Sequence, residues 1–499
     1  MATGHPCSAR AGAQILAEGG NAFDAALAAA FAGAVCESAL TGPCAGGFLL
    51  ARPASRKPTL LDFFVAAPGL GPDGSPLRPE ELWNFTVPFG AADQVFHHGP
   101  ASVATPGMTA GLLETHRRWC TLPLTELVAP ATRLARDGVT ITAEAAYLNE
   151  ILADMLKATP QCAEIHAPAG YVLAEGETLR IPDLADTLEA IAAGKAKELE
   201  SAIQAHQATT GGHVTGTDLD EYQVIEREPL MHSYRGVQMF TNPPPSSGGL
   251  LIAAALDKLE AEAAPIDDAT HYVKMARAGA YANSMRDESF PDALHHPDAA
   301  TRLIESRKPT GSTTHVSAVD AEGNLASMSS SNGAGSGVVV PGTGVMLNNI
   351  MGEEDLNPGG FGLVPPGRRM TSMMAPSILL GANESAVAIG SAGSNRLRSA
   401  ILQTVMSVVD AGMDLKDAIA RPRVHPEGIG VDIEAGVPGE AIDALFDDGH
   451  RVRRWSAMNL FFGGVSAVAH KRGEFSGAGD PRRGGHAAVA TKTGQVIDL

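Results

Sequence analysis

Long runs of lysine or arginine are absent from this 499-residue sequence, and aromatic residues make up only 5% of it. Its 56 acidic residues outnumber its 37 basic residues, so the net charge is −19 with neutral histidines. Nucleic acids and anionic lipid surfaces repel a chain of this charge. We therefore expect neither a nucleic acid nor a membrane as a partner.

A secretory signal is also missing from the first 20 residues, which contain no basic segment followed by an apolar one. The most apolar run, Ala25 to Val35, is too short to cross a bilayer and is typical of a buried, alanine-rich helix. These two features predict a cytoplasmic location.

Cysteine is rare, and its five copies are odd in number, contain no CxxC pair and lie in the first third of the chain. This pattern favours buried reduced thiols over a disulfide framework or a metal site. The five residues are Cys7, Cys36, Cys44, Cys120 and Cys162.

Several motifs that would identify a cofactor or a common hydrolase are absent. The sequence contains no GxxxxGK[ST] phosphate loop, no GxGxxG after a strand, no GxSxG elbow and no HExxH zinc pair. The doublets His97-His98 and His295-His296 lie in sequence that predicts loops, without the spacing of helical metal ligands. We therefore expect no metal and no organic cofactor.

What the chain does contain is glycine, 55 residues of it, and enough hydrophobic residues, 44%, for a large core. Strand and helix patterns alternate over the whole length, without a low-complexity linker, which favours a single α/β (α+β) body. The predicted helices cover residues 8–18, the segment after Asn21, 122–137, 184–199, 250–259, 270–286, 397–411 and 439–447. The predicted strands cover residues 48–50, 58–66, 313–319, 325–331, 377–381, 386–390, 463–470 and 486–491.

The hairpin over residues 313–331 is the segment that carries a chemical signal. It begins Thr313-Thr314-His315, turns at Asp320 to Asn324, and follows a loop at residues 308–312. A hydroxyl is a weak nucleophile unless a base lies beside it. A threonine at a newly cut chain end carries its own α-amine as that base, and it needs a rigid strand and a preceding loop that can leave. An ordinary threonine-rich edge strand would show the same periodicity.

Taken with the segments around it, this hairpin resembles that of the γ-glutamyltransferase family of N-terminal nucleophile hydrolases. The resemblance extends over nearly the whole chain, and its order and spacing make it specific. The matching segments are Gly4-His5-Pro6, Gly19 to Ala26, Ala104 to Gly107, Leu134 to Gly138, Pro243 to Gly249, Thr313 to Asp320, Gly323-Asn324, Leu347 to Asn349, Ser372 to Pro376 and Asp480 to Arg482.

The resemblance implies a four-layer αββα sandwich and an inactive precursor that cuts itself between Ser312 and Thr313. Residues 1–312 would form a large subunit, and residues 313–499 would form a small subunit that stays associated with it. Thr313 would be the nucleophile and its α-amine the base. By the same resemblance, the other catalytic positions are Ser330 as the supporting hydroxyl and Gly393 and Ser394 as the oxyanion pair. Asn332 matches the asparagine that contacts the substrate amine.

The sequence departs from the family mainly at the positions where the amino-acid end of a γ-glutamyl group would bind. Phe64 occupies the position of an arginine that clamps the α-carboxylate, and Ser372-Met373 replaces a Ser-Ser pair. The family's glutamine and aspartate for the α-amine match Ile350 and Glu353. Loss of one charge-assisted bond of about 1.5–3 kcal/mol weakens binding roughly 10–100-fold.

Two interpretations of the pocket stay open. In one, Arg368, Arg369 or Arg396 supplies the clamp and the substrate is γ-glutamyl or glutathione-like. In the other, Phe64, Ile350 and Met373 form an apolar wall, and the enzyme is an acylase for a glutaryl or less polar amide.

In both interpretations a small amide or short peptide reacts through an acyl-Thr313 intermediate, with water or an amine as acceptor. The segment from Glu353 to Ser372 is shorter than in lid-bearing relatives, which favours hydrolysis over transfer. An alternative from another class is a non-catalytic homologue that binds a small amide without turning it over.

Overall fold

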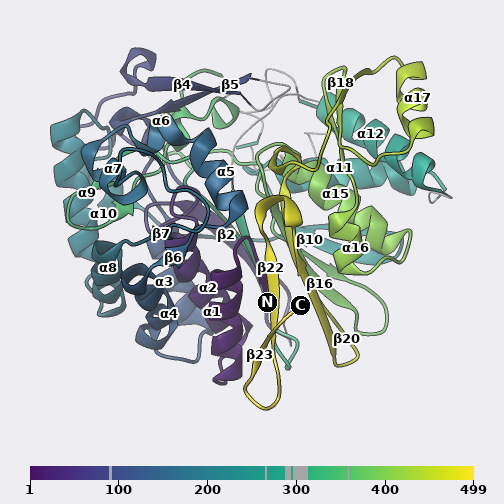
Figure 1. The fold of residues 1–499 in the computed structure, drawn as a ribbon, viewed down its shortest axis with the longest axis horizontal. Helices are drawn as coiled ribbons and strands as arrows, with labels where there is room; N and C mark the ends of the chain where they lie inside the picture. The colour runs from purple at the N-terminus through teal and green to yellow at the C-terminus, as the bar shows by residue number, and fades with distance from the viewer. Residues whose placement is uncertain (55, 89–92, 264–266, 287–293, 296–312, 358) are drawn as a thin grey trace.

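Two β-sheets face each other between two helical layers (Figure 1). This computed structural model describes the chain except for residues 55, 89–92, 264–266, 287–293, 296–312 and 358. The predicted mixed α/β sandwich is confirmed. None of the helices in the described part of the chain is both long and apolar enough to cross a membrane.

The first sheet has eight strands in the order β23-β22-β1-β11-β12-β2-β3-β8, and each neighbouring pair is antiparallel. In chain order the strands are β1 (Ala2–Thr3), β2 (Gly46–Arg52), β3 (Thr59–Phe63), β8 (Ile225–Arg227), β11 (Thr314–Val319), β12 (Leu325–Ser331), β22 (His486–Ala490) and β23 (Val496–Asp498). The predicted hairpin at 313–331 therefore lies in the middle of this sheet, between strands from the first 52 residues.

The second sheet has six strands in the order β21-β20-β16-β15-β10-β9. They are β9 (Leu230–Tyr234), β10 (Val237–Thr241), β15 (Ser377–Leu380), β16 (Ala386–Ala392), β20 (Gly464–Lys471) and β21 (Glu474–Gly479). Smaller sheets pair β4 (Trp83–Pro88) with β5 (Asp93–His98), β6 (Val139–Thr140) with β7 (Thr178–Leu179), β13 (Val339–Val340) with β14 (Val345–Met346), and β17 (Val424–Glu427) with β18 (Gly430–Ile433), which also pairs with β19 (Arg451–Arg454).

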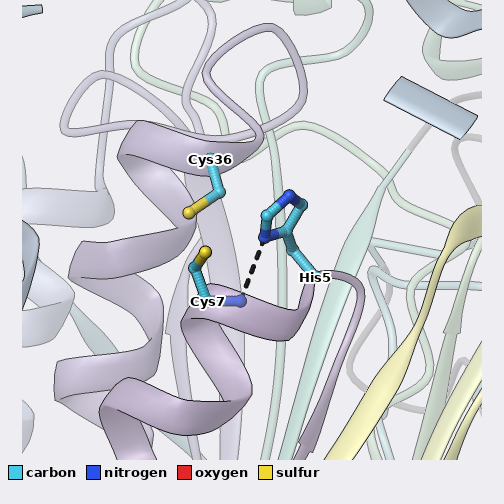
Figure 2. Close-up of side chains that lie close together, drawn as sticks. All are labelled: His5, Cys7 and Cys36. Atoms are coloured by element: carbon cyan, nitrogen blue, oxygen red, sulfur yellow. Dashed lines mark hydrogen bonds between the residues drawn. The ribbon is translucent and has the colours of Figure 1, made fainter. Parts of the chain in front are cut away.

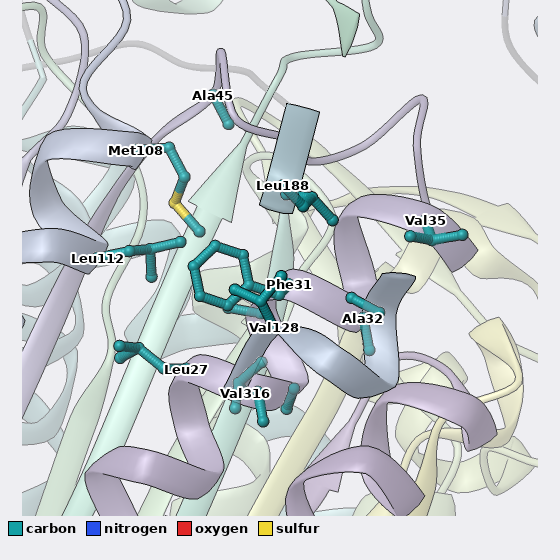
Figure 3. Close-up of a cluster of buried hydrophobic side chains, with 14 of the residues drawn as sticks. Leu27, Phe31, Ala32, Val35, Ala45, Met108, Leu112, Val128, Leu188 and Val316 are labelled. Atoms are coloured by element: carbon teal, nitrogen blue, oxygen red, sulfur yellow. The ribbon is translucent and has the colours of Figure 1, made fainter. Parts of the chain in front are cut away.

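The helical layer over the first sheet is built around α2 (Ala22–Cys36), whose 15 residues are all buried. Its start is the predicted cap: the Asn21 side chain accepts from the Asp24 N–H at 3.0 Å, and the Asp24 side chain accepts from the Asn21 N–H at 2.9 Å. Leu27 and Phe31 of α2 pack toward Val316 of β11 (Figure 3). Burial of each of these large side chains contributes about 1.5–3 kcal/mol.

The same layer contains α1 (Pro6–Ala17), α3 (Met108–Trp119), α4 (Leu124–Asp137) and α8 (Pro182–Ala192). The opposite layer contains α11 (Gly248–Glu260), α12 (Asp268–Ser284), α15 (Arg396–Val409) and α16 (Leu415–Ala420). The remaining helices are α5 (Ala143–Ile151), α6 (Ala153–Leu156), α7 (Pro160–His166), α9 (Ala196–Thr210), α10 (Gly216–Glu221) and α17 (Gly439–Asp447).

Two predicted elements are wrong. The single helix expected over 184–199 is divided between α8 and α9, because Gly194 adopts a left-handed φ of 80° that ends α8. His97 and His98 lie in strand β5, not in a loop, since β4 pairs with them across a hairpin. His296 of the second doublet lies outside the described residues.

Asp320 connects the hairpin turn to the helical layer. One of its carboxylate oxygens accepts from the Asn324 N–H at 2.9 Å, and the other accepts from the Ala22 N–H at 2.9 Å, at the start of α2. Charged acceptors stabilise a helix N-terminus. The turn and α2 therefore hold β11 and β12 from one end.

Candidate active site

Thr313 immediately precedes β11, and its side chain is buried, with 2% exposure. The register of the hairpin pairs Thr314 with Ser330, so the next step toward the open end places Thr313 opposite Ser331. Ser312, on the other side of the predicted cut, lies outside the described residues. The structure thus describes the nucleophile candidate and its strand, but not the bond that would break.

Ser330, predicted as the supporting hydroxyl, lies on the other face of the hairpin from Thr313. Side chains alternate between the two faces of a strand. Thr314 donates to Glu37 Oε1 at 3.0 Å, and the Ser330 hydroxyl forms a 2.8 Å hydrogen bond with the hydroxyl of Thr41, both on the helical side. Ser331 is the hairpin hydroxyl that shares a pocket with Thr313. The structure thus brings Ser331, one residue after the predicted position, into the pocket with Thr313, and the role of a supporting hydroxyl stays a prediction.

A small pocket collects Thr313 and three of the residues predicted to contact substrate. Its lining consists of Phe64, Thr313, Ser331, Leu356, Ser372, Met373 and Met374. Four of these seven side chains are apolar. The structure therefore brings Phe64, Ser372 and Met373 to the nucleophile candidate, as the resemblance implied, and makes the pocket largely apolar.

The apolar wall is fixed by packing and by hydrogen bonds around it. Phe64 is fully buried and stacks on Phe48 with ring centroids 5.5 Å apart. Its N–H donates to Asp62 Oδ1 at 3.0 Å, and its carbonyl accepts from the Tyr222 hydroxyl at 2.7 Å. Ile350 belongs to the same buried cluster as Phe64. These contacts leave the phenyl ring little freedom to move aside for a charged group.

Ser372 and Met373 are similarly held. The Ser372 hydroxyl accepts from the Met374 N–H at 3.0 Å, and the Met373 sulphur accepts from the Ser247 hydroxyl at 2.9 Å. Because a hydroxyl has one proton to donate, Ser372 can still offer that proton to a ligand.

Two of the arginines considered as replacement clamps have defined structural partners. The Arg369 Nε lies 3.3 Å from Asp62 Oδ1, and its other nitrogens donate to the carbonyls of Phe64 and Gln223. Arg369 therefore supports the loop that presents Phe64.

Arg396 donates from Nε to the Phe461 carbonyl at 3.0 Å, and its guanidinium lies 4.4 Å from the centre of the Phe461 ring. Its Nη1 lies 3.4 Å from the Ser394 hydroxyl. Arg396 thus lies beside the predicted oxyanion pair. Arg368 is half-buried, and neither it nor Arg396 lines the Thr313 pocket.

Gly393 and Ser394 follow β16 directly and precede α15. Both adopt left-handed backbone angles, with φ of 108° and 62°. Successive residues of this kind turn their N–H groups toward a common concavity that suits an anion, and such strain in a serine is typical of functional sites. Ala392 and Thr314 line one cavity, so the end of β16 lies beside the start of β11.

His315 of the TTH motif has a structural environment, not a catalytic one. Its ring is buried between the sheets, where Nδ1 forms a 2.8 Å hydrogen bond with Ser329 and Nε2 a 3.0 Å bond with Ser317. Burial lowers the pKa of His315 to about 3. The ring is therefore neutral, and Gly390 of β16 leaves the space that it occupies.

Asn332 and Glu353 lie beside the turn that follows β12. Asn332 is fully buried, and neither its amide oxygen nor its amide nitrogen has a hydrogen-bond partner among the described residues. An unpaired buried amide costs about 1–3 kcal/mol, so such a group is expected to meet a ligand or a water molecule. Glu353 is 5% exposed and accepts from the Ala334 N–H at 3.3 Å.

Burial raises the pKa of Glu353 to about 7, from an ordinary value of 4.5. The folded chain therefore holds a proton between about pH 4.5 and 7 that the unfolded chain has lost, and stability falls as pH rises through this window. Because one pKa unit corresponds to about 1.4 kcal/mol, we expect Glu353→Gln to stabilise the protein by about 2–3 kcal/mol more at pH 8 than at pH 5. Urea unfolding of both proteins at the two pH values measures this difference.

The exposed neighbour Glu354 provides the matched control, since Glu354→Gln makes the same chemical change one residue away without removing a buried carboxyl. An equal effect of Glu353→Gln at pH 5 and pH 8 would show that the Glu353 carboxyl ionises normally in the folded protein.

Three potential metal ligands lie close together on the helical side of the first sheet, in and beside α1 and α2. His5, Cys7 and Cys36 each offer one atom within 4.8 Å of the others, and they form the one such group found among the described residues. All five cysteines are free, but only Cys36, Cys44 and Cys162 are buried as predicted; Cys7 and Cys120 are half-buried.

Comparison with known proteins identifies the family and the fold. Residues 7–490 match the family model of gamma-glutamyltranspeptidase. The chain belongs to the gamma-glutamyltranspeptidase family. The predicted enzyme class, a γ-glutamyltransferase-like amidohydrolase, is thereby confirmed. Enzymes of the gamma-glutamyltranspeptidase family act on small amides and consist of two chains after processing.

Relatives of this gamma-glutamyltranspeptidase-family chain include acylases and glutathione hydrolases. The acylase ACY 1 proenzyme of Pseudomonas sp. (strain V22) is 33% identical, with 94% of this chain and 89% of the relative covered. The glutathione hydrolase proenzyme of Bacillus subtilis (strain 168) is 30% identical, with 98% and 90% covered. The cephalosporin acylase of Bacillus halodurans has a similar structure, with a TM-score of 0.81, 26% identity, and coverage of 99% of this chain and 95% of the acylase.

Proposed function

We propose that this protein cuts itself between Ser312 and Thr313 and then hydrolyses a small amide whose acyl group is less polar than γ-glutamyl. The observation that carries this proposal is the mainly apolar pocket in which Thr313 and Ser331 lie beside Phe64 and Met373. Two families of relatives, acylases and glutathione hydrolases, are compatible with the chain; the pocket favours the acylases.

The proposed reaction uses Thr313, Ser331 and the backbone of Gly393 and Ser394. The α-amine of Thr313, freed by the cut, takes the hydroxyl proton as the oxygen attacks the amide carbonyl. The N–H groups of Gly393 and Ser394 stabilise the negative oxygen that forms. Collapse of this intermediate expels the amine and leaves an ester on Thr313, which water then hydrolyses. Ser331 supports the Thr313 oxygen in both steps.

Asn332 and Glu353 are proposed to bind the substrate beyond the scissile bond. The amide of Asn332 has both a donor and an acceptor to offer, and both are buried without partners. Glu353 can accept a proton or donate one near neutral pH because of its raised pKa. The acid at this position therefore tolerates a neutral substrate group as well as an amine.

Acyl selectivity is the direct test. We expect kcat/KM for simple apolar acyl p-nitroanilides, which have no carboxylate, to exceed that for γ-glutamyl-p-nitroanilide at least 10-fold, because no arginine is found among the described residues that line the Thr313 pocket. Met373→Ser should lower the ratio of the two kcat/KM values, since it places a second hydroxyl beside Ser372. Met374→Ser, in the same pocket wall, is the matched control and should leave the ratio unchanged.

A wild-type preference for the γ-glutamyl substrate would favour the other interpretation, in which Arg368 or Arg396 reaches the carboxylate. An inactive protein with a mature Thr313 end would instead favour the non-catalytic homologue. We also propose that water outcompetes amine acceptors, that the location is cytoplasmic, and that the enzyme turns over an internal amide or a glutathione-related compound.

A further inference from the structure

Cys7 and Cys36 form a thiol pair where two buried helices meet. Cys7 lies in the first turn of α1, and Cys36 is the last residue of α2, which packs against it. Their sulphur atoms lie within 4.8 Å of each other and of a His5 ring nitrogen. Figure 2 shows both thiol groups pointing into the same space, with the His5 ring beside them.

The two thiols have different environments. Cys7 is half-buried at a helix N-terminus, where the peptide dipoles favour negative charge, whereas Cys36 is 7% exposed. The hydrogen bond with Cys36 holds the pKa of the Cys7 thiol well below its usual range, and the same contact with Cys7 raises the pKa of Cys36. Cys7 thus provides a thiolate, and Cys36 provides a neutral thiol next to it.

The position of His5 favours thiol chemistry over a metal centre. Its Nδ1 accepts the Cys7 N–H at 3.2 Å and caps α1. In Figure 2 this nitrogen faces the sulphur atoms, and the other ring nitrogen points away from them. A metal bound by all three residues would take the lone pair that caps the helix. A bond between the two sulphurs leaves the cap intact.

We propose that Cys7 and Cys36 are a redox-active pair that a peroxide converts to a disulfide. The Cys7 thiolate attacks one peroxide oxygen, which breaks the O–O bond, releases hydroxide and leaves Cys7 as a sulfenic acid. The Cys36 thiol then attacks the Cys7 sulphur; the S–S bond forms, and the sulfenic oxygen leaves as water with the Cys36 proton. Two thiols are oxidised by two electrons, and one peroxide is reduced to two molecules of water.

The surroundings of Cys7 and Cys36 indicate how an oxidant would reach them and what a disulfide would constrain. A cavity is lined by His5, Cys36 and Glu37, and Cys7, which is not part of that lining, is itself half-buried, so we expect a small oxidant to reach the Cys7 sulphur. Cys36 directly precedes Glu37, whose carboxylate accepts from the Thr314 hydroxyl. The disulfide would therefore constrain the end of α2 next to the strand that begins after Thr313.

Peptide mapping of the purified full-length protein tests the pair. The protein is treated with hydrogen peroxide and then digested, without reduction, by trypsin and a glutamate-specific protease. Cleavage after Arg10 and Glu37 separates Cys7, Cys36 and Cys44 into three peptides. We expect the Cys7 and Cys36 peptides to be joined, lighter by two hydrogen atoms, and separated again by dithiothreitol.

Single variants assign the roles. In Cys36→Ser, dimedone should trap Cys7 as its sulfenic acid; in Cys7→Ser, no disulfide should form. Cys120, also half-buried but with a thiol pKa raised by burial, is the matched control. At pH 6, iodoacetamide should label Cys7 at least 10-fold faster than Cys120 in the untreated wild type, a comparison that needs no variant to fold.

Three results would overturn the proposal. One is equal labelling of Cys7 and Cys120; another is a peroxide-treated protein without the joined peptide. The third is one equivalent of zinc in the purified protein that protects both thiols until a chelator removes it, which would assign His5, Cys7 and Cys36 as a metal site.

Discussion

Thr313→Ala is expected to yield one uncut chain with no measurable amidase activity. The substitution removes the hydroxyl that would attack both the preceding peptide bond and the substrate. The other pocket hydroxyls, on Ser331 and Ser372, do not lie at the new chain end and have no α-amine as a base. Intact mass under denaturing conditions should show a single 51.5 kDa species, where the wild type shows two, the smaller beginning at Thr313. Thr313→Ser should restore both cutting and slow turnover.

The adjacent Thr314 is the matched control for this experiment. Its hydroxyl points to the opposite face and donates to Glu37, so Thr314→Ala should cost stability, about 1–3 kcal/mol, while the chain is still cut before residue 313. A Thr313→Ala protein that is cut at the same bond would remove Thr313 from the mechanism.

Ser331→Ala is expected to lower kcat about 10–100-fold with little change in KM. A hydrogen bond to a group that becomes charged contributes about 1.5–3 kcal/mol, and in the proposed mechanism Ser331 supports the Thr313 oxygen during attack and departure. Ser330→Ala makes the same chemical change one residue away, where the hydroxyl forms a hydrogen bond with Thr41, and should leave kcat within about twofold. Steady-state kinetics on a glutaryl or acyl p-nitroanilide separates the two.

The opposite ranking, with kcat sensitive to Ser330 and not to Ser331, would restore the position that the sequence pattern suggested. Circular dichroism of both variants checks that neither loses its fold, since both side chains are at least 95% buried.

Local signals in the sequence predicted the frame of the site. The cap at Asn21, the hairpin turn at Asp320 and the helix at 439–447 depend on neighbouring residues, and the structure contains all three. The fold class and the enzyme family followed from motif order over the whole chain. Phe64, Ser372 and Met373 line one pocket with Thr313, and their contact with a substrate stays a prediction.

The errors arise where distant parts of the chain decide the outcome. Ser330 and Ser331 differ only in which face of β12 they occupy, and that face is set by the pairing with β11 and by Thr41 from another element. Residues equally far from the centre of the hairpin turn lie opposite each other, and this count would have placed Ser331 opposite Thr313. Nothing local connects Cys7 to Cys36 across 28 intervening residues; only the packing of α1 on α2 brings them together.

The strand order of the larger sheet has a consequence for what a subunit means here. The hairpin of β11 and β12 lies between β1 and β2, and β22 hydrogen-bonds to the other edge of β1. A cut before Thr313 would therefore leave two polypeptides that alternate within one sheet. Separation of the two pieces would break the β22–β1, β1–β11 and β12–β2 pairings and leave those strand edges unpaired. The cut would add two chain ends, but the two polypeptides would remain a single folding unit.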